Sequence, residues 1–179
     1  MDDAARERLQ QRILNVAFLM LGDREAAEDV AQETLLRTVE RHAQFRGDGS
    51  LFAWACSIAI NLCRARRLAD RKAPRAVDPA RLDGKSPAHG PVSNAIILET
   101  HQRAASAVRG LSPILREAFV LRFIEDLPFQ DIAEITGVSE GAARLRARRA
   151  RLSLQSHLAD LLEPAVRGRL DVQPTPARP

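Results

Sequence analysis

LPFQDIAEITGVSEGAARLRARRAR, residues 127–151, is the most informative stretch of the chain. It predicts a helix-turn-helix: a short helix over 129–135, a turn, and a second helix that begins after Ser139. Gly137 suits the turn because glycine adopts left-handed backbone conformations at little cost. The hydroxyl of Ser139 can cap the second helix. The helices can cross closely because their facing positions are apolar or small: Ile132, Ala133, Ala142, Ala143, Ala147 and Ala150.

The outer face of this second helix is strongly basic. Arg144, Arg148 and Arg149 lie on it, with Leu145 beside them, and such a face can enter a DNA major groove. The residues leave open whether the arginines pair with guanine or contact phosphate. The alternative is an arginine-rich solvated helix in a simple helical hairpin. Such helices normally place glutamates four residues from their basic residues. Glu140 is the one acidic residue of the second helix over 139–151, which favours DNA binding.

The rest of the second half is also helical in pattern. Apolar residues at helical spacing predict a helix that ends near Gly110, and Ser112-Pro113 is typical of the start of the next one. We expect that next helix to bury four large side chains: Leu115, Phe119, Val120 and Phe123. Several prolines after Glu163 indicate a disordered tail over 163–179.

Three more helices are predicted in the first half. Gly22 ends the first, and Asp23 can cap the second. Ser50 can cap the third, which follows a tight loop at 45–50 and runs through Leu62 into a basic cluster. In the second helix, helical spacing predicts an inner face of Ala26, Val30, Thr34, Leu35 and Val39, and an outer face of Glu28, Asp29, Gln32, Glu33 and Arg37.

From Ala73 to about Ser93 the composition changes to four prolines and two glycines, which predicts a linker. Fully extended, about 20 residues span roughly 70 Å. The expected fold is therefore all-α, with two small helical domains joined by a flexible linker and a helix-turn-helix in the second. The expected boundaries are a first domain at 1–75, the linker at 76–93, a second domain at 94–162 and the tail at 163–179. Whether the domains pack together or move freely stays open.

The composition limits the class of protein. Hydrophobic residues make up 45% of the 179 residues, aromatics 4%, and Tyr is absent, which suits packed helices. No apolar run approaches the roughly 20 residues that span a bilayer, and the start is acidic, unlike a signal peptide, so we expect a cytoplasmic protein. Cys56 and Cys63 lie two turns apart on one helix, too far to bridge. We expect two buried thiols, no metal site and no cofactor.

Charge is strongly segregated, although the net charge is only +4. Residues 23–40 hold six acidic side chains against two basic ones, whereas 64–75 hold six basic side chains against one acidic one. Residues 139–151 add five arginines. Separate charged faces indicate separate partners, and basic stripes on helices are typical of nucleic-acid binding.

The second half resembles the carboxy-terminal domain of extracytoplasmic-function sigma factors. The matching residues are Leu111-Ser112-Pro113, Arg116-Glu117, Val120-Leu121-Arg122, Asp131-Ile132-Ala133-Glu134-Ile135 and Gly141. The first half is similar to the acidic helix of that family at 27–34. It is also similar to the family's promoter-melting segment, at Phe45-Arg46-Gly47, Phe52, Trp54, Ile58-Ala59 and Asn61. Two such motifs in the right order are more specific than either alone.

The resemblance implies a non-catalytic protein that binds core RNA polymerase, directs it to promoters and helps to open the DNA. Asp29, Gln32 and Glu33 match positions that dock on the clamp helices of the large polymerase subunit. The segment that reads the non-template strand of the minus-ten element would use stacking aromatics and nearby cations: Phe52, Trp54, Asn61, Arg64 and Arg67. The minus-thirty-five element would be read from the second helix of the helix-turn-helix, at Ser139, Arg144, Leu145, Arg148 and Arg149. An anti-sigma factor is a further expected partner.

Three alternatives compete with this interpretation. A sigma-like mimic would sequester an anti-sigma factor without binding promoters, but mimics usually carry a receiver domain and would not need the arginine face. An ordinary helix-turn-helix repressor would not need the acidic helix or the Phe-Arg-Gly loop. An enzyme is disfavoured, because the sequence contains no glycine-rich phosphate loop and no nucleophile–base pair.

Overall fold

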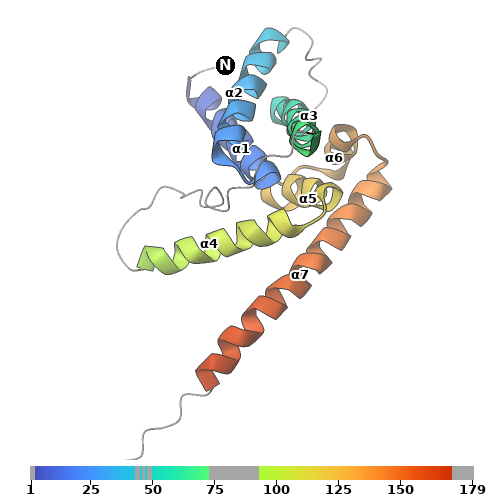
Figure 1. The fold of residues 1–179 in the computed structure, drawn as a ribbon. Coiled ribbons are helices and arrows are strands. Elements are labelled where there is room, and N and C mark those ends of the chain that lie inside the picture. The colour runs from blue at the N-terminus through green and yellow to red at the C-terminus, as the bar shows by residue number, and fades with distance from the viewer. Residues whose placement is uncertain (1–2, 43–44, 46, 48–49, 73–92, 171–179) are drawn as a thin grey trace, which may run out of the picture.

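The computed structural model describes residues 3–42, 45, 47, 50–72 and 93–170, with the backbone alone for 72, 93–101 and 157–170. All regular structure in these residues is helical, as expected (Figure 1). The expected linker falls almost entirely on 73–92, outside the described residues. Within the described parts of the chain, no helix is long and apolar enough to cross a membrane.

The first domain is a bundle of three helices: α1 (Asp3–Leu21), α2 (Arg24–Glu40) and α3 (Leu51–Lys72). Gly22 ends α1 with φ +77°, a left-handed conformation that suits glycine. The carboxylate of Asp23 accepts a hydrogen bond from the backbone N–H of Ala26 at 2.9 Å. The hydroxyl of Ser50 accepts one from the N–H of Ala53 at 3.0 Å. All three predicted helix boundaries are confirmed.

The second domain holds α4 (Ser93–Gly110), α5 (Pro113–Phe119), the π-helical turn η3 (Val120–Ile124), α6 (Phe129–Thr136) and α7 (Glu140–Leu170). α7 is much longer than expected. It passes through Pro164 and ends at Leu170, so residues 163–170 are helical where a disordered tail was predicted. A proline inside a helix loses one hydrogen bond but does not always end it. Residues 171–179 lie outside the described residues.

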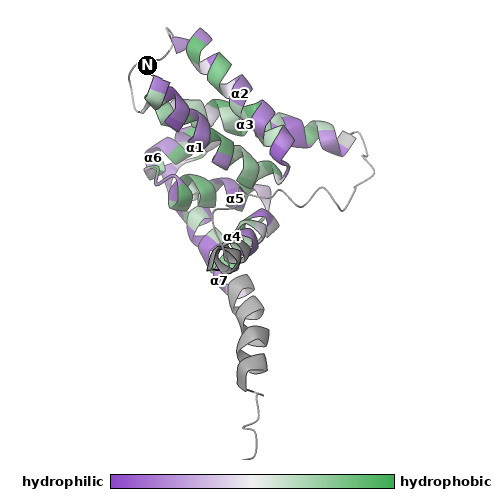
Figure 2. Ribbon diagram, turned by 90° about the vertical axis from the view of Figure 1, so that its left-hand side faces the viewer, coloured by the Kyte–Doolittle hydropathy of each residue, from purple (hydrophilic) through white to green (hydrophobic). Residues whose placement is uncertain are grey.

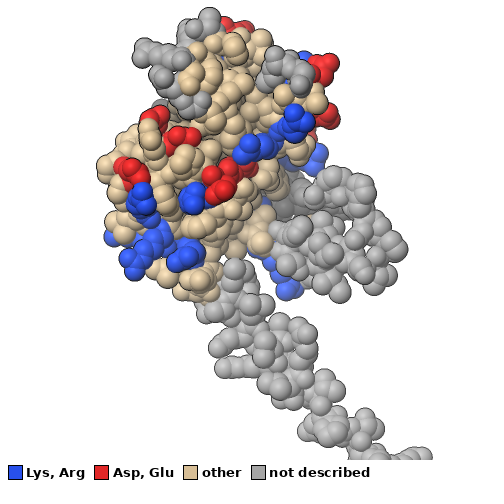
Figure 3. All heavy atoms as spheres, turned by 180° about the vertical axis from the view of Figure 1, so that it is seen from behind, with Lys and Arg blue, Asp and Glu red and all other residues tan. Residues whose placement is uncertain are grey.

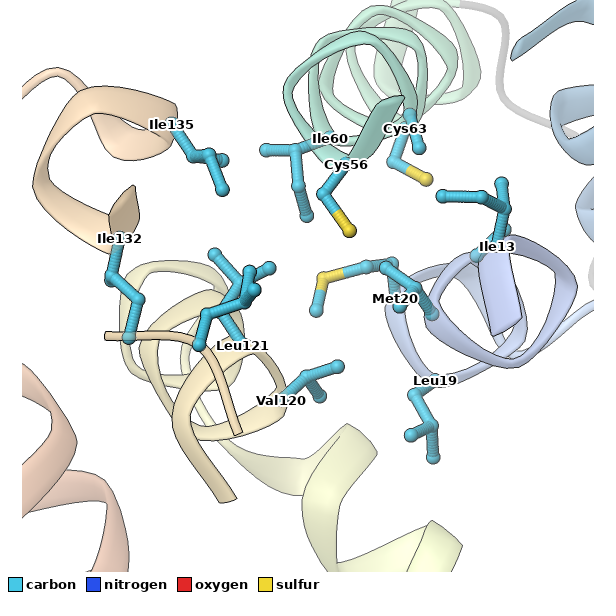
Figure 4. Close-up of a cluster of buried hydrophobic side chains, with 14 of the residues drawn as sticks. Ile13, Leu19, Met20, Cys56, Ile60, Cys63, Val120, Leu121, Ile132 and Ile135 are labelled. Atoms are coloured by element: carbon cyan, nitrogen blue, oxygen red, sulfur yellow. The ribbon is translucent and has the colours of Figure 1, made fainter. Parts of the chain in front are cut away.

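The two domains share a single hydrophobic core. Met20 of α1 and Cys56 and Ile60 of α3 lie around Leu121 of η3, and Ile13 extends the same cluster beside Cys63 (Figure 4). α6 packs directly against α3 and adds its own buried side chains, Ile132 and Ile135. Figure 2 shows hydrophobic segments where these helices meet. The question of domain placement is therefore answered: the described parts of the domains are packed together, not apart.

Two expected core residues are at the surface. Val39 of α2 is 58% exposed, because Thr38 takes the inward position and donates its hydroxyl proton to the carbonyl of Thr34 at 2.7 Å. Phe123 is 43% exposed. The wider π-helical turn changes the angular spacing after Phe119, and the two rings pack on each other with centroids 5.1 Å apart. A constant helical period could not predict the exposure of Phe123, whereas in α2 it favours Thr38 over Val39, because Val30, Thr34 and Thr38 follow each other at four-residue steps.

Both cysteines are free and buried, as predicted. Burial raises the pKa of each thiol, that of Cys63 from 9.0 to about 12, with a smaller contribution from Glu117. The pKa of Cys56 is raised further by the same cause, with a contribution from Glu125. Both thiols therefore stay protonated at pH 8, and the thiolate is the reactive form.

We expect neither thiol to react with Ellman's reagent at pH 8 in the native protein, and both to react at once in urea. A raised folded-state pKa also means that the unfolded chain loses these protons first as pH rises. The free energy of unfolding should therefore decrease above about pH 9. Rapid labelling of native protein, or stability that increases between pH 8 and 10, would contradict the burial described above.

Candidate nucleic-acid interface

The helix-turn-helix is formed by α6, the turn at Gly137 and the start of α7. Gly137 adopts φ +71°, and the N–H of Val138 donates to the carbonyl of Ala133 at 3.0 Å, which closes the end of α6. The hydroxyl of Ser139 caps α7 by accepting from the N–H of Ala142 at 3.3 Å. Three alanines bury the inner face of α7: Ala143, Ala147 and Ala150. The local geometry predicted from the sequence is confirmed.

The opposite face of α7 is exposed and basic. Leu145 is 45% exposed, and Arg148 and Arg149 are both at the surface. Among the described residues, neither arginine side chain has an ion pair or hydrogen bond. Figure 3 shows Lys and Arg atoms gathered around the start of α7. Arg148 and Arg149 are consecutive, and the opposite side of α7 is packed against the protein. Both cations are therefore well placed to contact a DNA groove.

Arg144 is less free than its two neighbours. Its guanidinium pairs with the carboxylate of Glu140 one turn earlier and lies 4.8 Å from the ring centroid of Phe129. A second guanidinium, that of Arg122, lies 5.1 Å from the same ring. These contacts hold Arg144 against α6, which restricts the directions in which it can reach DNA.

The five side chains predicted to bind the minus-ten element lie along α3. Phe52 and Trp54 are half-buried in its first turn, and Asn61 is exposed. The ring of Trp54 packs on Phe45 with centroids 5.6 Å apart, so Trp54 is neither fully in the core nor free. Arg67 is half-buried further along the helix. α3 therefore brings these residues to one element, but most of them already have partners within the protein.

Arg64 has the strongest such partner. Its Nε and Nη2 atoms donate to the two carboxylate oxygens of Glu117 at 2.9 and 2.6 Å, a bidentate pair between the domains. Hydrogen bonding to Glu117 raises the pKa of Arg64 above its ordinary value. Phe52 is also covered, because the guanidinium of Arg12 lies 3.4 Å from its ring centroid. Arg12 in turn donates to the carboxylate of Glu125 at 2.9 Å.

The predicted polymerase-binding residues lie on the outer face of α2. The Asp29 side chain is 61% exposed and has a long ion pair of 3.6 Å with Arg66. Gln32 is exposed, and Glu33 pairs with Arg37 at 2.6 Å. The three residues lie three and four positions apart, so they share one face. This face leaves acidic groups accessible to a basic partner.

A half-buried arginine joins the two domains at the end of α1. Arg116 donates from Nη1 to the carbonyl of Met20 at 2.6 Å, and from Nη2 to the carbonyls of Leu111 and Arg109. Burial lowers its pKa to about 10, with smaller contributions from Arg67 and Arg109. The side chain stays charged at neutral pH and satisfies a carbonyl that the end of α1 leaves open.

Sequence reasoning missed the contacts between the domains. It identified Arg116-Glu117 as part of a motif but gave neither residue a partner, and it did not single out Arg12 or Glu125. A glutamate directly before Ala118-Phe119-Val120 was a usable signal, because a carboxylate among apolar residues needs a cation. Within the described residues, no three His, Cys, Asp or Glu side chains are grouped to hold a metal ion.

Comparison with known proteins agrees with this arrangement. Residues 6–73 match the family described as Sigma-70 region 2, and residues 101–154 match Sigma-70, region 4. The chain is 33% identical to the RNA polymerase sigma factor CarQ of Myxococcus xanthus, over 75% of this chain and 76% of that protein. It is 29% identical to the RNA polymerase sigma-H factor of Pseudomonas aeruginosa, over 87% and 85%.

A longer relative is the probable RNA polymerase sigma factor RfaY of Xanthomonas campestris. The two are 30% identical over 89% of this chain, which spans 40% of the length of that protein. Among solved structures, the sigma factor RpoE in complex with the anti-sigma factor NepR from Bartonella quintana aligns with a TM-score of 0.68 at 25% identity, over 89% of this chain and 98% of that one. The order of its domains, its helix-turn-helix and these similarities show that the chain belongs to the extracytoplasmic-function RNA polymerase sigma factors.

Proposed function

We propose that this sigma factor directs RNA polymerase to promoters through three separate helical surfaces. The outer face of α2 binds the clamp helices of the large polymerase subunit. The loop before α3 and the exposed side of α3 bind the non-template strand of the minus-ten element. The outer face of α7 binds the minus-thirty-five duplex. The protein adds recognition and DNA opening to the polymerase, with no catalysis of its own, and it acts where the polymerase acts, in the cytoplasm.

The exposed arginines of α7 are the observation that carries the proposal. Arg148 and Arg149 have no ion pair or hydrogen bond to the described residues, whereas Arg144 is held by Glu140. Arginine can pair bidentately with guanine or neutralise phosphate, so both groups are available for DNA. Ser139 is exposed at the N-terminus of α7, and a helix N-terminus suits a phosphate. Leu145 offers an apolar contact, for example with a thymine methyl group.

The minus-ten surface is supported by its chemistry. Unstacked bases pack on aromatic rings next to cations, and α3 places Phe52 and Trp54 on the same helix as Asn61, Arg64 and Arg67. Arg64 must first lose its pair with Glu117 of the second domain, and Phe52 must be uncovered by Arg12, which Glu125 of the second domain holds. Promoter opening on the polymerase therefore requires the domains to separate in part.

An anti-sigma factor is the proposed regulator. The sigma factor of Bartonella quintana that shares this fold was solved in complex with such a protein. A mimic that only sequesters an anti-sigma factor would not need unpaired arginines on α7, so we favour a sigma factor that binds promoters itself.

The polymerase surface can be tested by replacing Asp29 and Glu33 with Ala. We expect the double substitution to weaken binding to core polymerase by about 1–3 kcal/mol, because two charges leave a complementary interface. Helical content should not change, since the Asp29 and Glu33 side chains lie at the surface, 61% and 42% exposed. Equilibrium titration of labelled core polymerase measures the affinity, and circular dichroism measures the helical content.

The matched control replaces Asp3 and Glu7 of α1 with Ala. It removes the same charge from exposed positions outside the proposed surface. Equal loss of affinity in both double variants would show that net charge, and not the outer face of α2, determines polymerase binding.

A further inference from the structure

Two glutamates of the second domain reach across to arginines of the first. Glu117 on α5 binds Arg64 of α3 through two hydrogen bonds of 2.9 and 2.6 Å. Glu125, directly after η3, binds Arg12 of α1 at 2.9 Å. The glutamate side chains are only 6% and 5% exposed, whereas the arginines are 39% and 47% exposed. The carboxylates are therefore fixed in the interface, and the arginines lie at its edge.

Both pairs occupy groups that the first domain needs for DNA. Arg64 is itself a proposed minus-ten contact. The Glu117 carboxylate accepts hydrogen bonds from its Nε and Nη2 atoms, the same donors that would bind a phosphate. Arg12 donates a hydrogen bond to Glu125, and its guanidinium carbon lies 3.4 Å from the ring centroid of Phe52. In the closed arrangement, the ring face of Phe52 is thus covered by a guanidinium and not available to a base.

The pairs also contribute to keeping the domains together. A glutamate that is 95% buried is costly without a cation, so each carboxylate strongly favours the arrangement in which its arginine is present. When the domains separate, both carboxylates reach water and both arginines are released. The equilibrium between closed and open forms therefore depends on Glu117 and Glu125, in addition to the apolar contacts in Figure 4.

We propose that Glu117 and Glu125 form an interdomain latch that withholds Arg64 and Phe52 from DNA until the domains are pulled apart. The proposal rests on the minus-ten role given above to Arg64 and Phe52. It assigns this chain an inhibitory contact of its own, made by two carboxylates that compete with nucleic acid for the first domain. Polymerase binding would open the latch by holding the domains apart.

The latch is tested with the full chain carrying Glu117→Gln and Glu125→Gln. Glutamine keeps the shape and some hydrogen bonding but removes the charge of each pair. The matched control is Asp3→Asn with Asp126→Asn, which removes two carboxylates that pair only within their own helix or turn. Asn also tolerates the left-handed backbone of residue 126, where φ is +51°. Urea unfolding of both variants checks that they fold.

Two measurements separate opening from DNA binding. Opening is followed by pulse labelling with N-ethylmaleimide and peptide mapping of Cys56, which faces Leu121 across the interface (Figure 4). DNA binding is followed by fluorescence anisotropy of a labelled 20-nucleotide single strand of mixed sequence. For the latch variant we expect Cys56 labelling and DNA affinity each to increase by about tenfold, because the apparent affinity scales with the open fraction. The control variant should match the wild type in both.

Each other outcome overturns the latch in a distinct way. Unchanged Cys56 labelling means that the two pairs do not hold the domains closed. Faster labelling without tighter DNA binding means that the domains open but Arg64 and Phe52 are not DNA contacts, which would also contradict the proposed minus-ten surface. An equal increase in DNA affinity in the latch and control variants means that net charge, not release of the latch, is responsible.

Discussion

Replacing Leu121 with Ala is expected to destabilise both domains together, although Leu121 lies in the second. Its side chain is fully buried, between α1, α3 and α6. Loss of a buried leucine side chain costs about 2–5 kcal/mol, from lost burial and from the cavity left behind. At an m-value of roughly 2 kcal/mol per molar, the urea midpoint should fall by about 1–2.5 M.

The single tryptophan makes this result informative. Trp54 lies on α3, so its fluorescence reports on the first domain alone, whereas circular dichroism reports on every helix. With a shared core, Leu121→Ala shifts the two transitions by the same amount. The control Leu152→Ala, at a position that is 48% exposed, should change stability by less than about 0.5 kcal/mol. A Trp54 transition that stays in place while the dichroism midpoint falls would show two independent domains.

Replacing Arg148 with Ala is expected to weaken binding to a minus-thirty-five duplex by about 1–3 kcal/mol if the guanidinium pairs with a base. Arg148 is exposed and has no partner among the described residues, so its removal disturbs no internal contact. The measurement uses the polymerase complex and a duplex that the wild-type chain selects from a random pool. Binding is compared between that duplex and versions changed at each position.

Arg148→Lys is the matched control, because lysine keeps the charge but cannot form the planar bidentate pair. If Arg148 reads a base, the lysine variant loses most of the same affinity, and discrimination decreases at one position of the duplex. If both variants keep the wild-type order of preference among duplexes, and the alanine variant only reduces the salt dependence, Arg148 contacts phosphate and does not specify sequence.

Local features of the fold followed directly from the sequence. The caps at Asp23, Ser50 and Ser139 and the turn at Gly137 depend on residue chemistry within a few positions, and such signals are visible in a single chain. The alanine face of α7 was equally readable, because helical periodicity alone places it. The outer faces of α2 and α7 could be predicted for the same reason.

Features that depend on distant segments could not be predicted in the same way. Spacing does not show that Glu117 meets Arg64, 53 residues earlier, or that Glu125 meets Arg12 across 113 residues. A constant helical period placed Phe123 inside, because the π-helical turn that displaces it has no clear sequence signature. The prolines after Glu163 indicated a tail, but α7 continues through Pro164. In each case a tertiary or backbone effect overrode a local signal.

Run-off transcription with purified core polymerase is the most direct test of the proposed function. On a library of promoter fragments, the wild-type chain should give promoter-dependent transcripts that core polymerase alone does not give. The Asp29→Ala, Glu33→Ala double variant should lose these transcripts at all promoters, whereas Arg148→Ala should lose them most at promoters with a strong minus-thirty-five element. The absence of any promoter-dependent transcript, with core polymerase active with another sigma factor and this chain folded, would contradict a role in promoter recognition.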